Sequence, residues 1–568
     1  MKRWSIKQTA DKSTVEKLGK MLNVSEPIAQ LLYQRNLTDF EDAKIFFRPD
    51  LNNLHNPFLM KDMDAAVTRI QKAIAGNQKI LIYGDYDVDG TTAVALVYSF
   101  LSTIYSNLDY YIPDRYAEGY GISFQGIDFA KQNSFDLIIA LDCGIKSHDK
   151  IEYANSLGID FIICDHHRPG ETIPAAVAVL DPKREDCSYP FKELSGCGVG
   201  FKLMQALCIK LNIDVEKLYP YLDLVVVSTA ADIVPIYGEN RILAYYGLKQ
   251  VNANPRPGIR AILELNKIKK QLSVSDLVFY IGPRINAAGR IDKGKRAVEL
   301  LISKTKKEAE EFGAGINTSN TERKTIDSTI TQEALALIAA DENFGSRKST
   351  VLFNPGWHKG VIGIVASRLI EKYYKPTIIL TESNGKATGS ARSVKDFDVY
   401  EAIDACSDLL EQFGGHKYAA GLTMLPENVD AFIQRFEQVV SSTIQDHLLI
   451  PEVEIDVEVD FKDITTKFYN VLKQFAPFGP DNMNPVFVTR GVICKGYARI
   501  VGETHIKFDV FQPESKESIF SAIGFGLAGM YDKIQTSVPF DICYTIEEND
   551  WNGIVNLQLN IKDIRFLE

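Results

Sequence analysis

The sequence predicts an α/β protein with a parallel sheet in its first large domain. Short apolar segments alternate with helical segments from about residue 64 onwards, and acidic residues directly follow three of the apolar segments. Alternating strands and helices are typical of parallel sheets, whose ligands bind at the carboxyl ends of the strands. The C-terminal region instead contains short strands separated by Gly and Asn, which predicts a small OB-like β-barrel.

The 568 residues are enough for several domains. We expect an N-terminal helical cap (1–60), a catalytic α/β domain (61–295), a long connecting helix (296–340), a second and smaller α/β domain (341–450) and an OB-like nucleic-acid-binding barrel (451–568).

The expected elements follow in order along the chain. Helices at 65–75 and 91–101 flank a strand at 79–83, and further strands are predicted at 108–112, 137–141 and 161–164. A proline-free segment from about 295 to 340 predicts the connecting helix, and a strand at 350–353 opens the second α/β domain. The tail is predicted to form strands at 453–461, 486–489, 506–511, 518–523 and 554–561.

The composition excludes several classes of protein. The sequence has no secretory signal and no run of 18 apolar residues, so we expect a cytoplasmic protein that does not bind membranes. Its eight cysteines form no C-x-x-C pair, which argues against a zinc ribbon and favours buried, reduced thiols. The net charge of -11 argues against a uniformly basic surface, but ten Lys/Arg against six Asp/Glu between 284 and 324 indicate either a local basic groove or a solvated helix surface.

The segment Asp85-Tyr86-Asp87-Val88-Asp89-Gly90 places three carboxylates directly after an apolar strand. Such acids repel one another and are costly to desolvate unless cations neutralise them, so the segment predicts a metal site. An EF-hand loop is one alternative, but it requires Glu at position 12, where this chain has Leu96, and a helix before the loop. A solvated acidic turn is the other.

Two further strand ends carry the same kind of chemistry. Asp142 ends the strand at 137–141, Asp165-His166-His167 follows the strand at 161–164, and Asp232 follows the apolar segment 224–231. Carboxylates with imidazole and no thiolate suit Mn²⁺ or Mg²⁺ better than Zn²⁺. The predicted metal ligands are Asp85, Asp87, Asp89, Asp142, His166 and Asp232.

Neighbouring side chains on an extended segment point in opposite directions, so we predict that His166 binds metal and that His167, with Asp165, acts catalytically as a donor to the substrate. Alternatively, a histidine can be a core residue, and Asp232 can be a helix cap. Two adjacent ions can activate water and bind phosphoryl oxygens, which suggests phosphodiester hydrolysis.

At this point the motifs resemble those of the DHH phosphoesterases, and further segments resemble the single-strand-specific exonucleases within that family. The resemblance covers nearly the whole chain, and one segment, 478–485, departs from the expected Gly-x-Gly-Asn-Pro type. The segments that carry it are 84–90, Asp142-Cys143-Gly144, Asp165-His166-His167, Ala231-Asp232, Pro113-Asp114-Arg115, Glu118-Gly119-Tyr120-Gly121, 283–290, 356–363, 389–393 and 413–417.

The resemblance implies a 5′-to-3′ exonuclease that acts on single-stranded DNA in recombination and repair and depends on two Mn²⁺ or Mg²⁺ ions. It also implies a monomer, with a single-strand-binding protein and a helicase as candidate partners. The substrate-binding residues that we predict are Arg115, Arg284, Arg290, His358, Gly360, Ser390, Arg392 and His416.

The residues themselves support an end-phosphate pocket. Gly360 precedes an amphipathic helix, whose free N–H groups can bind anions, and Arg392 lies in an expected small-residue turn where it can clamp a phosphate. The alternatives are a surface salt bridge for Arg392 and an ordinary tight turn at Gly414-Gly415, which would make His416 incidental.

In the tail, aromatic residues stand near basic ones, as in a platform on which bases stack. Alternatively, these aromatic residues form the core of the barrel. The residues concerned are Tyr497, Phe508, Phe511 and Trp551 with Lys495, Arg499 and Lys507.

Two competing functions remain: hydrolysis of pyrophosphate or short oligonucleotides, which needs no barrel, and an inactive single-strand-binding scaffold, which has no use for clustered carboxylates.

Overall fold

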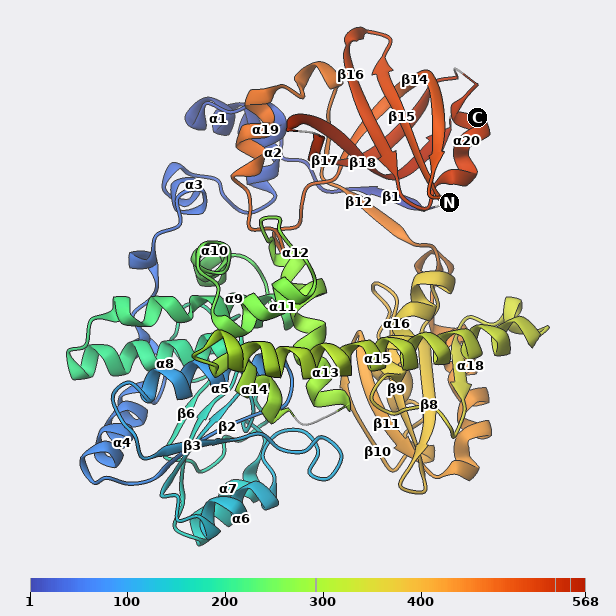
Figure 1. Ribbon diagram of the computed structural model, residues 1–568. Coiled ribbons are helices and arrows are strands. Elements are labelled where there is room, and N and C mark those ends of the chain that lie inside the picture. Colours follow the sequence, from blue (N-terminus) through green and yellow to red (C-terminus); the bar gives the residue numbers. More distant parts are fainter. Residues whose placement is uncertain (1, 292–293, 537, 552, 567–568) are drawn as a thin grey trace.

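The computed structural model describes residues 2–291, 294–536, 538–551 and 553–566 (Figure 1). Its described residues form two five-stranded sheets, a six-stranded sheet that curls into a barrel, and a two-stranded sheet. Figure 1 shows the first sheet at the lower left, the second at the right and the barrel at the top. The predicted α/β class with a C-terminal barrel is confirmed.

The first sheet is parallel throughout, in the order β3-β2-β4-β5-β6. The sequence prediction missed β6, because a three-residue strand is too short to show a periodic pattern. The strands are β2 (Ile80–Gly84), β3 (Leu108–Tyr111), β4 (Leu137–Leu141), β5 (Asp160–Cys164) and β6 (Ala178–Leu180).

Helices cover both faces of this sheet, so its strands are apolar at nearly every position. In β2, Ile80 and Ile82 join the core with α4, α5 and α8, whereas Leu81 and Tyr83 join the core with α6 and α7. The covering helices are α4 (Met63–Ala75), α5 (Val88–Leu101), α6 (Phe124–Gln132), α7 (His148–Ser156) and α8 (Gly196–Leu211).

A long helix, α15 (Lys306–Ala340), runs from this first lobe to the second sheet (Figure 1). The prediction of one continuous helix from 295 to 340 is wrong, because the chain forms two helices there: α14 (Lys295–Ile302) ends before α15 begins. Thr305 caps α15: its side chain accepts a hydrogen bond from the Glu308 N–H, and the Glu308 carboxylate accepts one from the Thr305 N–H. Before α14 come α9 (Leu222–Ala231), α10 (Gly238–Ala253), α11 (Pro257–Leu265), α12 (Val274–Asp276), the π-helical turn η4 (Leu277–Ile281) and α13 (Gly282–Ile291).

The second sheet has the order β10-β11-β9-β8-β7. Arg392 is the last residue of β9 and Gly414 and Gly415 lie within β10, so the expected turns at these positions are wrong. The elements are β7 (Thr350–Phe353), α16 (Ile362–Tyr373), β8 (Thr377–Ser383), β9 (Lys386–Arg392), α17 (Val399–Asp404), β10 (Gln412–His416), β11 (Ala419–Met424) and α18 (Val429–Thr443).

The tail forms a closed barrel, because β14 pairs with both β15 and β17. The sequence prediction missed β17, where polar residues interrupt the apolar pattern in Glu547–Asp550, and the expected strand at 453–461 is two short strands followed by a turn. The elements are β12 (Glu452–Ile455), β13 (Val457–Glu458), α19 (Thr466–Lys473), β14 (Phe487–Val501), β15 (His505–Gln512), β16 (Ser515–Gly524), α20 (Tyr531–Ile534), β17 (Phe540–Trp551) and β18 (Ile554–Phe566).

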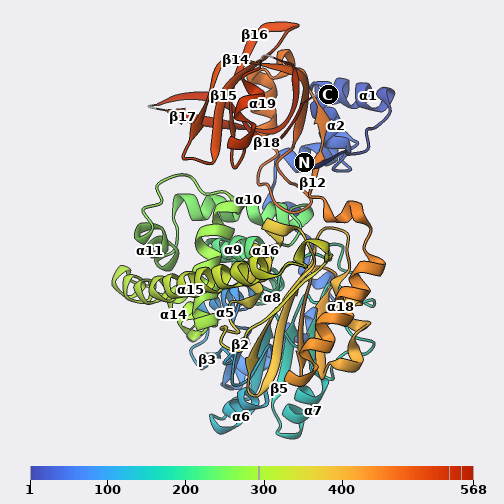
Figure 2. The same cartoon turned by 90° about the vertical axis from the view of Figure 1, so that its right-hand side faces the viewer.

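The N-terminal segment packs on the tail and is not purely helical. Its strand β1 (Arg3–Ile6) pairs in parallel with β12, and α1 (Lys12–Leu22) and α2 (Glu26–Tyr33) share a core with the barrel. Both views show these helices beside the barrel (Figures 1 and 2). The following helix, α3 (Phe40–Phe47), leads the chain towards the first lobe.

The described helices include none that is long and apolar enough to cross a membrane. All eight cysteines are buried and unpaired, as predicted.

Candidate active site

The acidic residues meet at the carboxyl edge of the first sheet. Asp85 directly follows β2, Asp142 follows β4 and Asp165 follows β5, and these three strands are neighbours in the sheet. Because the strands are parallel, their ends lie along one edge. Asp142 adopts a left-handed backbone conformation (φ 59°), which turns the chain sharply as it leaves the strand.

Four of the predicted metal ligands form a tight cluster. The Nε2 atom of His166 lies 3.2 Å from Asp142 Oδ1, 3.6 Å from Asp89 Oδ2 and 3.6 Å from Asp232 Oδ2. Asp232 stands at the C-terminal cap position of α9, as the helix-cap interpretation expected. This position still leaves its carboxylate free to act as a metal ligand. Two groups of donor atoms are close enough to hold an ion, Asp142-His166-His167 and Asp89-His166-Asp232.

The donor atoms of this cluster fit a divalent cation. In the described part of the chain, Asp142 Oδ1 and both ring nitrogens of His166 are buried without a hydrogen-bond partner. Burial, followed by the charge of Asp89, raises the pKa of Asp142 well above its ordinary value. The same two causes raise the pKa of Asp232 to about 8. Carboxylates crowded in this way need a cation, and oxygen and imidazole donors without thiolate suit Mn²⁺ or Mg²⁺.

The three aspartates of the acidic segment have different surroundings. Asp89 accepts hydrogen bonds from the N–H groups of Gly196 and Cys197 and from the Ser228 hydroxyl, at 2.7 Å each. Asp87 caps α5 by accepting from the Gly90 N–H (3.0 Å). Asp85 accepts from the Gly121 N–H (3.1 Å) and leaves its other oxygen buried without a partner.

Burial and the nearby charge of Asp87 raise the pKa of Asp85 to about 8. Asp85 is not one of the donors in the two tight groups, and its one hydrogen bond holds the loop that follows β3.

His167 is oriented by Asp165. Its Nδ1 atom lies 2.7 Å from Asp165 Oδ1, and its Nε2 atom lies 3.3 Å from the Tyr120 hydroxyl. Burial acts to lower the pKa of His167, but the Asp165 hydrogen bond and charge raise it to about 9. Burial acts to raise the pKa of Asp165, but the hydrogen bond from His167 lowers it to about 2. At neutral pH His167 is therefore a cation that can donate from Nε2.

The two histidines do not point in opposite directions. Their ring centroids are 4.6 Å apart, and both rings approach Asp142. The expected alternation fails because the residues lie in the loop after β5 and not within a strand.

Beside the cluster, a cavity of about 510 Å³ opens between the first lobe and the second sheet. It brings together five of the eight predicted substrate-binding residues, which come from the β3–α6 loop, α13, the start of α16 and β9. These are Arg115, Arg290, Gly360, Ser390 and Arg392. Tyr120 also lines this cavity, and it contacts the metal cluster through its hydroxyl.

The cavity is rich in unneutralised positive charge. Among the described residues, none of the guanidinium groups of Arg115, Arg290 and Arg392 pairs with a carboxylate, so the surface salt bridge considered for Arg392 is not found. Burial, followed by the charge of Arg115, lowers the pKa of Arg290 to about 10, and burial also lowers that of Arg392. An anion in the cavity would relieve this repulsion.

Two glycines allow close packing around the cavity, Gly360 between the two lobes and Gly363 between α16 and β9 within the second lobe. A Cβ on Gly360 would lie 2.7 Å from the Tyr116 hydroxyl, and one on Gly363 would lie 2.8 Å from Ser390 Oγ and 2.9 Å from Arg392 Nη2. The Gly360 N–H donates to His358 Nδ1 (3.1 Å), so it is not a free anion donor. The start of α16 is formed by the next residues, Val361 and Ile362, which are buried, and Val361 provides no side-chain cap.

The remaining predicted residues lie elsewhere. Arg284 directs its guanidinium to the Tyr280 carbonyl (2.6 Å) and to Asn266, and it does not line the cavity. His358 stands just behind Gly360, with its ring 6.3 Å from that of Tyr116. His416 is exposed at the end of β10 and accepts a hydrogen bond from the Tyr418 N–H (3.3 Å).

The tail contains a separate groove of about 810 Å³, lined by Arg499 and Lys507 among others. Of the aromatic residues named in the sequence analysis, Phe508 is buried core, Phe511 is half-buried and Tyr497 is 89% exposed. The Trp551 side chain lies outside the described residues.

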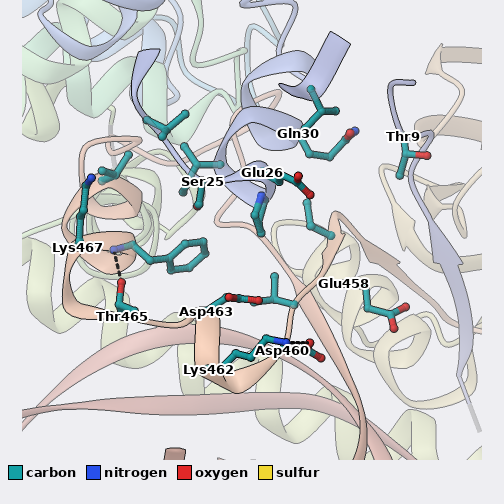
Figure 3. A pocket seen from close by; sticks show the side chains of 18 of the residues that line it. Thr9, Ser25, Glu26, Gln30, Glu458, Asp460, Lys462, Asp463, Thr465 and Lys467 are labelled. Atoms are coloured by element: carbon teal, nitrogen blue, oxygen red, sulfur yellow. Dashed lines mark hydrogen bonds and ion pairs between the residues drawn. The ribbon is translucent and has the colours of Figure 1, made fainter. Parts of the chain in front are cut away.

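A larger cavity, of about 980 Å³, lies between the N-terminal helices and α19 and is lined by none of the predicted site residues (Figure 3). Its charges are mixed. Lys462 pairs with Asp460 (3.1 Å), and Glu26 and Asp463 face the same space as Lys467. It therefore lacks the positive charge of the cavity beside the metal cluster.

Comparison with known proteins assigns the family. Three family models match: the DHH family N-terminal domain at 79–229, the DHHA1 domain at 347–442 and the RecJ OB domain at 455–563. The single-stranded-DNA-specific exonuclease RecJ of Bacillus subtilis is 35% identical over 99% of this chain and 70% of its own length. The chain belongs to the RecJ family. RecJ of Escherichia coli is 34% identical over 89% of this chain and 90% of its own length.

The fold is that of RecJ as well. The crystal structure of RecJ from Thermus thermophilus in complex with Mn²⁺ superimposes with a TM-score of 0.85 at 26% identity, covering 100% of this chain and 80% of that one. The resemblance drawn from the motifs is thereby confirmed.

The sequence analysis missed three residues at this RecJ site. Tyr120 and Lys359 line the cavity, and Asp181 is fully buried at the end of β6 with one oxygen unpartnered. Burial raises the pKa of Asp181 to about 7. The signal for Asp181 was present, because it follows the apolar run 178–180 as the other aspartates follow their strands.

In the segment that departs from the expected glycine pattern, an aspartate takes a left-handed backbone conformation. Asp481 adopts φ 58°, a conformation that glycine enters freely and that aspartate tolerates better than most residues. Asn482 then donates to the carbonyls of Phe475 and Pro477, at 2.8 Å each. The loop is therefore ordered by side-chain hydrogen bonds where a glycine is missing.

Proposed function

We propose that this protein is a metal-dependent exonuclease that hydrolyses single-stranded DNA stepwise from the 5′ end. The observation that carries the proposal is the position of Tyr120, which lines the cationic cavity and contacts His167 of the carboxylate cluster. A site that binds an end phosphate thus adjoins a site for hydrolysis. The names of its RecJ relatives, single-stranded-DNA-specific exonucleases, support the substrate and the reaction.

Two Mn²⁺ or Mg²⁺ ions would be held by Asp89, Asp142, His166 and Asp232, and the other two predicted ligands, Asp85 and Asp87, stand outside the two tight groups of donor atoms. When bound, such ions supply Lewis-acid activation of water and neutralise charge on the phosphate. Three hydrogen-bond donors hold the Asp89 carboxylate in place. The backbone of Asp142 is held by its own N–H, which donates to the Cys164 carbonyl (2.8 Å). The first RecJ structure compared above was solved with Mn²⁺, which supports this choice.

His167 would donate a hydrogen bond to a non-bridging oxygen or to the leaving oxygen of the scissile phosphate. Asp165 holds the ring by Nδ1, so that Nε2 faces Tyr120 and the cavity entrance. Against the effect of burial, the hydrogen bond to Asp165 and its charge raise the pKa of His167 and so favour the protonated ring that can donate. Asp165 itself stays ionised and acts by orienting the ring.

The cavity would bind the terminal 5′-phosphate. Arg115, Arg290 and Arg392 supply charge-assisted hydrogen bonds, and the Ser390 hydroxyl, which accepts from Arg392 (3.0 Å), lies beside them. A terminal phosphate carries more charge than an internal one, so this pocket would select chain ends. Binding the first phosphate here places the following phosphodiester towards the metal cluster, which gives the 5′-to-3′ direction.

The barrel would hold the remaining strand in the groove lined by Arg499 and Lys507. In the cell we place this activity in the cytoplasm, in DNA recombination and repair, with a single-strand-binding protein and a helicase as candidate partners and a monomer as the working form.

The test uses a 3′-labelled oligonucleotide with either a 5′-phosphate or a 5′-hydroxyl, incubated with Mn²⁺ or with EDTA. We expect a ladder that shortens from the 5′ end, faster with the phosphate, and no product in EDTA or from a blunt duplex. Hydrolysis of pyrophosphate or dinucleotides alone would indicate another DHH activity, and binding without hydrolysis would indicate a scaffold.

A further inference from the structure

Three strongly exposed apolar side chains lie on segments that meet beside the metal cluster. Of the large apolar side chains in the described residues, four are more than 60% exposed: Ile233 (66%), Phe279 (70%), Met483 (63%) and Tyr497 (89%). Tyr497 belongs to the barrel, but the other three belong to the end of α9, the turn η4 and the loop before β14. Exposed apolar groups concentrated in one region mark binding surfaces.

Direct contacts join these three segments. The Ile236 N–H donates to the Pro480 carbonyl (2.8 Å), and Gly479 is packed so tightly on Ile236 that a Cβ would lie 2.5 Å from its Cγ1. At the other side, a Cβ on Gly282 would lie 3.6 Å from Ala231 Cβ. Ile233, Phe279 and Met483 each stand within three residues of one of these contacts. We call these three side chains the apolar ledge.

The backbone is irregular at two of the three residues. Ile233 has φ 59°, a left-handed conformation that is unfavourable for a β-branched residue, and its exposed side chain gains no burial in return. Phe279 lies in a π-helical turn, and its neighbours Leu277 and Ile281 are buried while it points outward. Irregularities of this kind persist where the side chain they present has a use.

The ledge connects the two ends of the substrate path. Ile233 directly follows Asp232, whose Oδ2 lies 3.6 Å from His166 Nε2. Met483 lies four residues before β14, the first long strand of the barrel. The hydrogen bond between Ile236 and Pro480 therefore links the segment after Asp232 to the loop that leads into the barrel.

We propose that the apolar ledge binds the bases of the DNA strand on the 3′ side of the bond that is cleaved. This inference rests on the proposed exonuclease function. Every base has an apolar face, so stacking on Phe279 and contact with Ile233 and Met483 tolerate any sequence. A duplex keeps its base faces stacked inside, so it cannot use the ledge, and the ledge therefore contributes to the preference for single strands.

The test places one 2-aminopurine at successive positions of a 5′-phosphorylated oligothymidylate and measures its fluorescence on binding to the Asp142→Ala protein, which does not consume the probe. We expect a change at one or two adjacent positions that is lost in Phe279→Ala. Ile233→Asn, which keeps a residue that tolerates the left-handed backbone, should reduce it. The matched control is Phe40→Ala, because Phe40 is 52% exposed on α3, away from the ledge.

In the otherwise unmutated protein, Phe279→Ala should weaken binding of a long single strand about tenfold and leave turnover of a dinucleotide unchanged. The ledge is refuted if no probe position responds, or if Phe279→Ala behaves as Phe40→Ala does. If Phe279→Ala does not fold, Met483→Ala in the loop makes the same distinction. If the signal is position-specific and depends on Phe279 but the native protein does not hydrolyse DNA, the ledge is supported and the exonuclease proposal is overturned. If the native protein hydrolyses DNA but no such signal is seen, the ledge alone is overturned.

Discussion

The carboxylate cluster and the cationic cavity are built in opposite ways. The cluster is assembled at one edge of one sheet. Asp142 and His166 follow neighbouring strands, whereas Asp89 and Asp232 stand at the start of α5 and the end of α9. The cavity draws Arg115, Arg290 and Arg392 from distant parts of the chain and forms only where two lobes meet. Local sequence therefore specifies the first site, whereas the second depends on how α15 and Gly360 place the lobes and on how Gly363 of α16 packs against β9.

The electrostatics of the two sites are also opposite. Burial and then crowded carboxylates raise the pKa of Asp142 and Asp232, whereas burial and then crowded guanidinium groups lower that of Arg290. The cluster requires cations before it can accept a phosphate, whereas the cavity accepts one directly. Removing a group from each site should therefore have different consequences.

The largest effect should come from the cluster. Asp142→Ala, and separately His166→Ala, should abolish hydrolysis while leaving single-strand binding largely intact, because binding depends on the cavity and barrel. Loss of a group behind a metal ligand costs about 10- to 100-fold, so loss of a ligand itself should exceed about a hundredfold. Turnover is measured at limiting Mn²⁺, and binding by fluorescence anisotropy.

The control for this pair is Asp109→Ala, an exposed aspartate on β3 of the same sheet, which should keep wild-type turnover. Near-normal turnover of Asp142→Ala at limiting Mn²⁺ would contradict the assignment of the cluster.

The next effect should come from the cavity. Arg392→Ala removes one charge-assisted clamp, worth about 1.5 to 3 kcal/mol, so the preference for 5′-phosphate over 5′-hydroxyl substrates should fall by about ten- to a hundredfold. The ratio of kcat/KM for the two substrates measures it. Arg435→Ala, on α18, is the matched control, because this exposed arginine faces Asp408 at 3.4 Å. If the preference survives, the end pocket depends on Arg115 or Arg290 instead.

A smaller effect should follow from Gly363→Ala. The added Cβ meets the flexible ends of Ser390 and Arg392 and not the backbone, so the protein should fold while the two side chains move. We expect the phosphate preference to drop less than in Arg392→Ala, with an unchanged melting temperature. Gly315→Ala on α15 serves for comparison, because the nearest atom of a neighbouring helix to its Cβ position, Arg296 Nη1, is 4.0 Å away. An unchanged preference would mean that the close approach of α16 does not shape the pocket.

The sequence predicted the cluster better than the cavity for a physical reason. A carboxylate after a short apolar run is a local feature, and parallel pairing then determines where it lies. Asp181 follows the same rule and was missed only because its strand has three residues. The roles of Tyr120 and Lys359 in lining the cavity depend on the approach of the two lobes, which no local pattern contains.

The errors in the fold have the same origin. The turn expected at Arg392 is a strand end, because small residues in β9 allow close pairing with β8 and β11 and do not break the strand. Asp481 has a left-handed backbone conformation, which a glycine at this position would have indicated in the sequence but an aspartate does not. The pairing of β1 with β12 joins residues about 450 apart in the chain, which a local reading cannot detect.

The smallest effect should come from the barrel, and it separates strand holding from chemistry. Deleting the tail is a poor test, because Arg241 of α10 donates to the carbonyls of Phe475 (2.7 Å), Gln474 (3.1 Å) and Ala476 (3.0 Å), so truncation would disturb the first lobe as well.

Point variants of the barrel avoid this disturbance. Arg499→Ala and Lys507→Ala should each lower the slope of log affinity against log salt by about one for a long single strand, because one phosphate contact is lost. Turnover of very short substrates at saturation should stay unchanged. Lys516→Ala, an exposed lysine of β16 outside the groove, should leave the slope as it is. Equal slopes for all three variants and the native protein would mean that this groove does not hold DNA and that the barrel is a structural or partner-binding module, whereas loss of short-substrate turnover would mean that it takes part in the chemistry.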